Sequence, residues 1–297
     1  MPSLIINADD FGLTSGVNRA IVELHQAGVL TSATLMANAA ASDEAIKLAL
    51  ANPALGVGCH IVLVDGTPVL ASSEIPNLSH GSASAFGNSL GRFVRDLYSP
   101  FSTSSFRLDL EAEIEAEATA QIQSLQSRGL SLTHVDTHKH THMFPAVLRP
   151  VLRAARACGI TRIRNPFDSG WSRDTSAGVP WLRRAQVAAL SKLEASALKI
   201  IAEHGFATTD GTVGVMITGA LNRDSLSRTL ARMPEGTWEL VTHPGYHDGE
   251  LDAVRTRLKA SRDIERQGLK AIIDFPKIEL VNFAALASNG TSAPFAS

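Results

Sequence analysis

The chain has 297 residues, of which 44% are hydrophobic and 19% charged, a balance that is typical of a folded globular protein and excludes a disordered chain. Its formal net charge of −2 leaves no basic excess to bind a phosphate backbone, so we expect no nucleic-acid partner. Two cysteines are too few for a disulfide framework. No apolar stretch is long enough for a membrane span, and the first ten residues do not read as a signal peptide, so we expect a cytoplasmic protein.

Short apolar runs and segments of helical periodicity alternate in the first part of the chain. We predict strands at residues 4–6, 29–36 and 55–63, and helices at 17–28, 45–51 and 110–125. Residues 65–106 interrupt this alternation, because they are rich in Ser, Gly and Pro and have no clear period. We therefore predict an irregular, lid-like insertion there.

The second part of the chain continues the alternation. We predict an irregular loop at 165–181, strands at 132–136, 160–164, 213–217, 238–242 and 269–273, and helices at 145–158, 182–203, 223–232 and 252–267. Such repeats predict a parallel sheet covered by helices, and roughly seven or eight strands favour a distorted, TIM-like (β/α) barrel over an open sheet. We expect residues 1–287 to form this single domain, followed by a flexible tail at 288–297.

One segment concentrates histidines around a carboxylate. While the chain stays extended, a period of two places five side chains on one face, namely His134, Asp136, His138, His140 and His142. Accidental clustering at a polar strand end is the alternative. So many imidazoles beside a carboxylate favour a role in metal binding or proton transfer.

Three further motifs are weak when taken singly. An Asp9-Asp10 pair can cap a helix, His60 can be a core histidine, and His243 before Pro-Gly can be a loop residue. All of them, however, fall at the carboxyl ends of predicted strands, which a barrel brings to one mouth. One Asp with two His can hold a divalent ion, which leaves a second Asp and another His to move protons.

Four segments resemble the YdjC-like family of carbohydrate deacetylases, which includes chitooligosaccharide deacetylase. They are IINADDFGLTSGVNRAI, GVGCHIVL, THVDTHKHTHMFP and ELVTHPGYHD, in that order, and they span residues 5–248. The chain as a whole, including KLEASALKIIAEHGFATTDGTVGV, is similar to the branch associated with hopanoid biosynthesis. That branch is thought to remove acetyl from an N-acetylglucosaminyl hopanoid. The resemblance also implies a distorted (β/α) barrel.

The resemblance implies a role for individual residues. One divalent ion would be held by three ligands, Asp10, His60 and His138. The types of these ligands, not the resemblance, favour Zn²⁺, with Mg²⁺, Mn²⁺, Co²⁺, Ni²⁺ and Fe²⁺ as alternatives. Asp9 would act as general base and His243 as general acid. We assign three more residues to the substrate site, where the motif gives no firmer role: His140, His142 and Arg164.

Aromatic residues occur in both irregular segments. Because these segments follow predicted strands, we expect Phe86 and Trp171 at the barrel mouth, against the apolar part of a lipid-linked substrate. The alternative is that they only pack the loops onto the barrel. A lipid substrate would bring the enzyme to the inner membrane surface, and the resemblance suggests a homodimer.

Other functions stay open at this point. They are deacetylation of soluble chitooligosaccharides, a metal-dependent phosphoesterase or amidohydrolase, and a non-catalytic sugar-binding protein. Phosphoesterase and amidohydrolase barrels usually carry a His-x-His pair on the first strand, which here ends in Asp-Asp. A binding protein would need neither Asp9 nor His243.

Overall fold

The fold is built around one parallel sheet. The computed structural model describes residues 1–80, 86, 90–99, 103–175, 180–272 and 278–287. Within this part of the chain, the sheet has the strand order β4-β3-β2-β1-β6-β5, with β7 paired to β1. The strands are β1 (Ser3–Phe11), β2 (Ser32–Leu35), β3 (Gly56–Ile61), β4 (Val135–Thr137), β5 (Gly211–Val213), β6 (Thr237–Thr242) and β7 (Glu279–Leu280).

β1 lies at the centre of the sheet and carries the Asp9-Asp10 pair near its end. All but its first residue is buried, as expected for a parallel strand covered on both faces. Ala8 pairs with Ala33 of β2 and with Thr242 of β6, so the carboxyl ends of the three strands are level. The register with β2 shifts just after Ala8, and Asp10 has a left-handed φ of 65°. The chain therefore bulges where the aspartates project.

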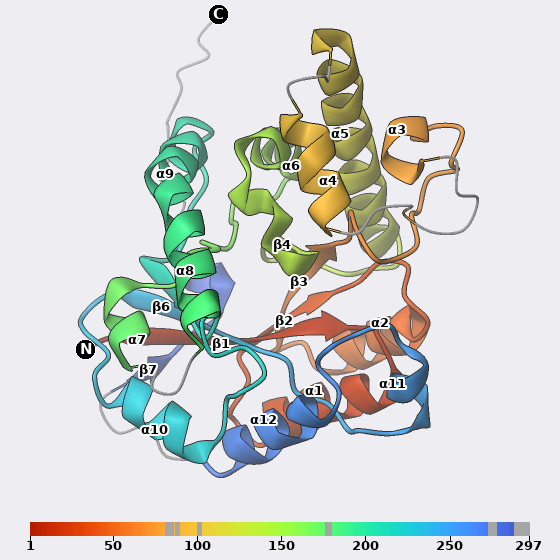
Figure 1. The fold of residues 1–297 in the computed structure, drawn as a ribbon. Coiled ribbons are helices and arrows are strands. Elements are labelled where there is room, and N and C mark those ends of the chain that lie inside the picture. The colour runs from red at the N-terminus through yellow and green to blue at the C-terminus, as the bar shows by residue number, and fades with distance from the viewer. Residues whose placement is uncertain (81–85, 87–89, 100–102, 176–179, 273–277, 288–297) are drawn as a thin grey trace, which may run out of the picture.

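Helices cover both faces of the sheet. Figure 1 shows α1, α10, α11 and α12 below the strands, and α4, α5, α6 and α9 above them. The α-helices are α1 (Ser15–Gln26), α2 (Ser42–Ala51), α3 (Pro76–Ser79), α4 (Leu90–Tyr98), α5 (Ser104–Gln126), α6 (Pro145–Ala157), α7 (Gly170–Thr175), α8 (Trp181–Leu190), α9 (Glu194–Glu203), α10 (Arg223–Leu230), α11 (Gly249–Ala253) and α12 (Ala260–Lys270). The 3₁₀ helices are η1 (His138–Met143), η2 (Ser191–Leu193) and η3 (Phe283–Ala285). In the described ranges, none of the helices is both long enough and apolar enough to cross a membrane.

The predicted distorted barrel is confirmed, but it does not close with regular strands everywhere. Residues 160–164 make only isolated parallel bridges, from Ile163 to Val135 and from Arg162 to Ala207. Residues 160–164 thus lie between β4 and the segment that leads to β5, but without a continuous ladder of strand hydrogen bonds. The curled sheet is thus a half-barrel whose strand ends still face one mouth.

Several element predictions need correction. The predicted strand at 269–273 is wrong in its described part, because Leu269 is buried on the last turn of α12 and the strand forms at Glu279–Leu280 instead. A short apolar run fits either state, and here helix packing decides. Residues 65–106 contain α3, α4 and the start of α5. The predicted helix at 182–203 is divided into α8 and α9, and that at 252–267 into α11 and α12. The predicted tail at 288–297 lies outside the described residues.

Candidate active site

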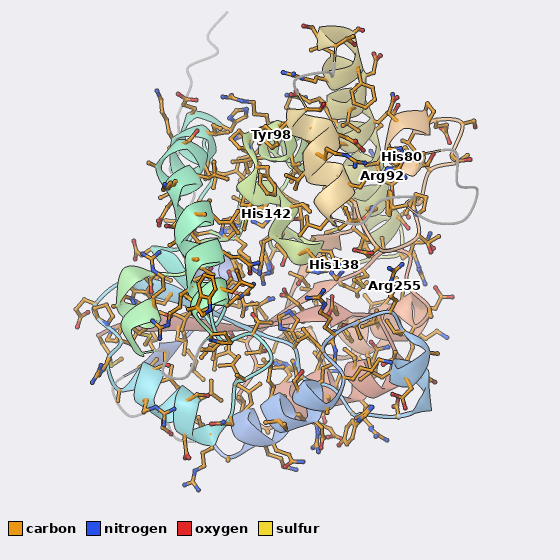
Figure 2. The ribbon with its side chains drawn as sticks, viewed as in Figure 1. His80, Arg92, Tyr98, His138, His142 and Arg255 are labelled. Atoms are coloured by element: carbon orange, nitrogen blue, oxygen red, sulfur yellow. The ribbon has the colours of Figure 1, made fainter. Side chains whose placement is uncertain are left out.

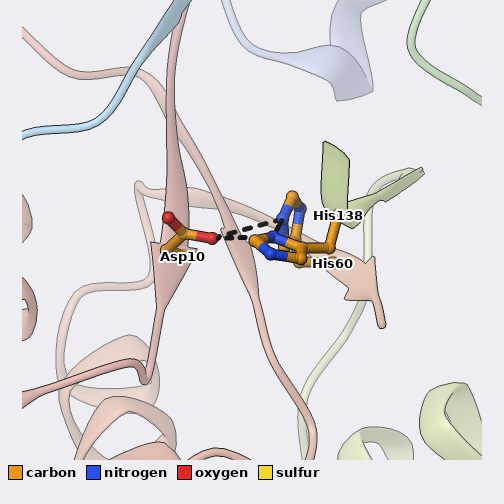
Figure 3. Close-up of side chains that lie close together, drawn as sticks. All are labelled: Asp10, His60 and His138. Atoms are coloured by element: carbon orange, nitrogen blue, oxygen red, sulfur yellow. Dashed lines mark hydrogen bonds and ion pairs between the residues drawn. The ribbon is translucent and has the colours of Figure 1, made fainter. Parts of the chain in front are cut away.

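Three side chains from separate elements meet at the carboxyl end of the sheet. His60 Nε2 lies 3.4 Å from Asp10 Oδ1 and 3.3 Å from His138 Nδ1, and His138 Nδ1 lies 3.2 Å from Asp10 Oδ1 (Figure 3). Ligand atoms at tetrahedral angles around a zinc ion would be about 3.4 Å apart. Asp10 Oδ1 is buried and has no hydrogen-bond partner among the described residues. The triangle formed by Asp10 Oδ1, His60 Nε2 and His138 Nδ1 therefore fits one divalent ion in both size and donor type.

The ring nitrogen of His60 that does not face the triangle, Nδ1, contacts a carboxylate. Its Nδ1 lies 2.7 Å from Asp136 Oδ1, and both side chains are buried. Burial alone would lower the pKa of His60, but the carboxylates of Asp136, Asp10 and Asp9 outweigh it and raise the pKa to about 10. The Asp136 contact directs Nε2 toward the triangle, as in many carboxylate–histidine–metal arrangements.

His138 reaches the triangle because β4 ends at Thr137. The chain then enters η1, where Lys139 and His140 have left-handed φ angles of 58° and 53°. The prediction that the histidines share one extended face is therefore wrong beyond the strand. Period-two alternation requires an extended backbone, and the turn separates His138 from the next two histidines.

Those two histidines, His140 and His142, do not belong to the triangle. His142 Nδ1 is 2.7 Å from Thr137 Oγ1, and its Nε2 is 3.2 Å from the carbonyl oxygen of Arg164, so it ties η1 to the next segment. The His140 ring lies 6.4 Å from the His142 ring. Burial lowers the pKa of His140 to about 3 and that of His142 to about 4, so both rings are neutral at neutral pH.

His134 lies at the other end of β4, in the core. Its ring stacks on Phe283 at a centroid distance of 3.6 Å. Gly58 makes room for it, since a Cβ there would lie 2.5 Å from His134 Cε1. Burial lowers the pKa of His134 to about 3. This member of the His-rich segment is structural.

Arg164 forms a buried charge network with carboxylates. Its Nη1 donates to Asp9 Oδ2 at 2.9 Å and its Nη2 to Asp9 Oδ1 at 2.6 Å. The same guanidinium pairs with Asp136 and Glu239. Burial would raise the pKa of Asp9, but Arg164 and the nearby histidines hold it far below its usual range. Arg164 is fully buried and donates to both carboxylate oxygens of Asp9, so its side chain has no exposed surface.

His243 follows β6 directly and faces Asp9. Its Nε2 lies 3.7 Å from Asp9 Oδ2, and its Nδ1 has no hydrogen-bond partner among the described residues. Burial lowers the pKa of His243 to about 4, so the ring is neutral at neutral pH. The predicted base and acid thus stand as a pair beside the triangle.

The two predicted aromatic residues are not brought to this cluster. Phe86 is only 5% exposed and packs in the core. Trp171 packs edge-on against Trp238, 5.3 Å between centroids, near the start of β6 and thus at the end opposite His243. An exposed aromatic does stand near η1: Tyr98 is 49% exposed, and its ring lies 5.8 Å from Phe144, the residue that follows η1. Figure 2 shows Tyr98 on α4, on the same side of the sheet as His138 and His142.

Sequence reasoning missed two charged residues of α12. Arg262 Nη2 pairs with Asp10 Oδ2, and Glu265 Oε2 accepts a hydrogen bond from His243 N at 2.7 Å. A signal for them exists in the sequence. Arg262, Glu265 and Leu269 follow a spacing of three and four residues, which places two charges on the apolar face of a helix. Charges in such a position need buried partners.

Sequence comparison finds one matching family and several similar proteins. The sequence profile of the family described as YdjC-like protein matches residues 3–277. A carbohydrate deacetylase from Brevibacillus brevis is 34% identical over 287 residues, covering 95% of this chain and 99% of that protein. A chitooligosaccharide deacetylase from Salmonella paratyphi B is 40% identical over 158 residues, covering 53% and 57%.

A solved structure shares the fold. The crystal structure of a protein from Enterococcus faecalis described as a cellobiose-phosphate cleavage protein aligns with a TM-score of 0.69 at 24% identity. The alignment covers 95% of this chain and 97% of that one. At this identity the likeness concerns the fold alone.

Proposed function

Because the chain belongs to the YdjC-like protein family, we propose that it is a carbohydrate deacetylase that hydrolyses the acetamide of an N-acetylated amino sugar. The products are acetate and a free amine. The observation that carries the proposal is the meeting of a metal-sized triangle with a carboxylate–imidazole pair at one mouth. The similarity to the Brevibacillus deacetylase over nearly the full length of both chains supports it.

We assign Asp10, His60 and His138 as ligands of one divalent ion. Two nitrogens and one carboxylate oxygen suit Zn²⁺, which commonly keeps an open position at such sites, and also suit Mn²⁺, Fe²⁺, Co²⁺ or Ni²⁺. Mg²⁺ fits less well, because it prefers oxygen ligands. When bound, such an ion polarises the amide carbonyl and lowers the pKa of a water molecule.

Asp9 and His243 supply the proton transfers. Arg164 keeps the Asp9 carboxylate ionised and fixes its direction, so that Asp9 can take a proton from the attacking water. As the carbon–oxygen bond forms and the carbon–nitrogen bond breaks, the departing nitrogen needs a proton. His243 is neutral at rest and lies 3.7 Å from Asp9, so the pair can pass the water's proton to that nitrogen.

The test is a comparison of two products. Purified protein is incubated with N-acetylglucosamine oligomers and, separately, with phosphate monoesters, and acetate and phosphate release are measured. We expect acetate release, with about 10²–10⁴-fold loss in Asp9→Asn and in His243→Ala. Phosphate release without acetate would favour the phosphoesterase. Sugar binding without either product would favour a binding protein.

For the substrate itself, we propose an N-acetylglucosaminyl hopanoid. Resemblance to the hopanoid-associated branch supports this choice. So do Trp181 and Leu182 at the start of α8, which are 78% and 55% exposed and could contact a lipid or a membrane surface. The competing substrate is a soluble chitooligosaccharide, as named for the Salmonella relative.

Two variants separate these substrates. Replacing Trp181 and Leu182 by Ser should raise KM for the lipid-linked substrate by orders of magnitude, since each large apolar side chain contributes roughly 1.5–3 kcal/mol when buried. Turnover of a soluble N-acetylglucosaminide should not change. Leu108, 68% exposed on α5, gives a matched control as Leu108→Ser. Efficient turnover of chitooligosaccharides, with no turnover of the lipid-linked substrate, would refute the hopanoid as substrate. The proposal that the protein is a deacetylase would not be affected.

A further inference from the structure

α12 places two buried charges against the site from below the sheet. Arg262 and Glu265 are each only 1% exposed, whereas Ile264 on the same helix is 49% exposed. The helix lies next to α1 and α10 on that side of the strands (Figure 1). Burying a charged side chain costs desolvation energy, which ion pairs and hydrogen bonds to its partners must offset. Their partners include Asp10, near the end of β1, and the backbone N–H of His243, just after β6.

Arg262 pairs with only one of the two carboxylate oxygens of Asp10. Its Nη2 pairs with Oδ2, while Oδ1 faces His60 and His138. Arg262 Nε donates to the carbonyl of Leu258 at 2.9 Å, so the guanidinium is itself held in place. The left-handed φ of 65° at Asp10 is uncommon for a residue other than glycine, and the ion pair helps to hold it. Only one carboxylate oxygen is therefore free to meet an ion.

Glu265 fixes the main chain that carries His243. Its Oε2 accepts from His243 N at 2.7 Å and its Oε1 from Gly219 N at 3.1 Å. Gly245 N donates to the carbonyl of Arg262 at 3.2 Å. The His243 ring has no hydrogen bond to an orienting side chain in the described part of the chain. Its position therefore depends on these backbone contacts.

We propose that Arg262 and Glu265 are positioning residues of the deacetylase. Arg262 restricts Asp10 to one ligand oxygen, and Glu265 sets the distance of His243 from Asp9. The inference rests on the proposed function, and the two residues act on different parts of the site. Arg262 should affect how a metal is bound, whereas Glu265 should affect proton transfer alone.

The test for Arg262 uses Co²⁺ added to metal-free protein, followed by its visible absorption. In Arg262→Met, Asp10 Oδ2 is released and can also bind, so we expect weaker visible bands from the higher coordination number, together with a lower kcat. Arg262→Lys keeps the charge and should recover part of the wild-type spectrum, and it serves if the Met variant does not fold. Arg257→Met, at an exposed position just before α12, is the control. Wild-type spectra in both Arg262 variants would overturn the role.

The test for Glu265 is Glu265→Gln, which turns an NH₂ group toward one of the two backbone N–H donors. We expect kcat to fall about 10-fold or more, the size of effect seen when a proton-transfer group is displaced, with KM and the Co²⁺ spectrum unchanged. Glu203→Gln, exposed on α9, is the matched control. An unchanged kcat, or a loss of Co²⁺ binding, would contradict the role. If wild type and Asp10→Asn bind Co²⁺ identically, the proposed metal site itself fails, which is a separate result.

Discussion

Replacing Asp136 by Asn probes how far the metal triangle depends on a carboxylate outside it. Asp136 Oδ1 lies 2.7 Å from His60 Nδ1, and its Oδ2 pairs with the guanidinium of Arg164. Arg164 can only donate hydrogen bonds, so the oxygen of Asn must face it. The NH₂ group then faces His60 Nδ1 and makes that atom an acceptor. The proton moves to Nε2, the atom that should bind the ion.

The expected loss is large enough to measure. Loss of such an outer partner typically weakens metal affinity about 10–100-fold, or roughly 1.4–2.8 kcal/mol. The assay is a competition titration of Zn²⁺ against a chromophoric chelator, with circular dichroism to verify the fold. Asp43→Asn, at a side chain that is 83% exposed, is the control. If Asp136→Asn is folded and binds Zn²⁺ as tightly as wild type, the role of Asp136 in orienting His60 is refuted.

Three further predictions concern the site and its surroundings. His138→Ala should lose metal binding strongly and His140→Ala much less, because His138 is one of the three ligands of the triangle and His140 is not; the reverse result in a metal titration would overturn the assignment. Asp9→Asn should abolish most acetate release while keeping the metal, and parallel loss of metal by elemental analysis would show that Asp9 is a ligand instead. Burial raises the pKa of Asp168 to about 6 from 3.8, so its contribution to stability is complete below about pH 3.8 and is lost as the pH rises through 6. In Asp168→Asn the amide oxygen can still accept from Met216 N, and the Ser172 hydroxyl can turn to accept from the NH₂ group. The variant should therefore be more stable than wild type above pH 6, by up to roughly 3 kcal/mol for about two pKa units, and denaturant unfolding at pH 4 and pH 8 should show the gain only at pH 8.

Much of the fold could be predicted because the hydrophobic period of each segment is visible in the local sequence. The stripe from Leu110 to Leu125 is the buried face of α5, and the polar ends of β1, β3 and β6 do meet at one mouth. That rule of parallel sheets brings Asp10 and His60 together although they lie on strands separated by β2.

The parts that could not be predicted depend on geometry that no pattern of residue types specifies. Left-handed φ angles at Lys139 and His140 turn η1 out of the strand direction, and residues other than glycine adopt such angles too seldom for the sequence to predict them here. From the sequence alone, we assign the single arginine Arg164 to the substrate site. Its burial among three carboxylates becomes visible only when strands far apart in sequence are packed.

The metal dependence of the proposed deacetylase is tested most directly by measuring metal content and acetate release on the same samples. Protein is stripped with a chelator and then titrated with Zn²⁺ in the presence of an N-acetylglucosaminide. We predict no acetate release from stripped protein, activity that rises in proportion to bound ion, and a plateau at one ion per chain. Full activity in metal-free protein, or a plateau unaffected by Asp10→Asn, would contradict this prediction.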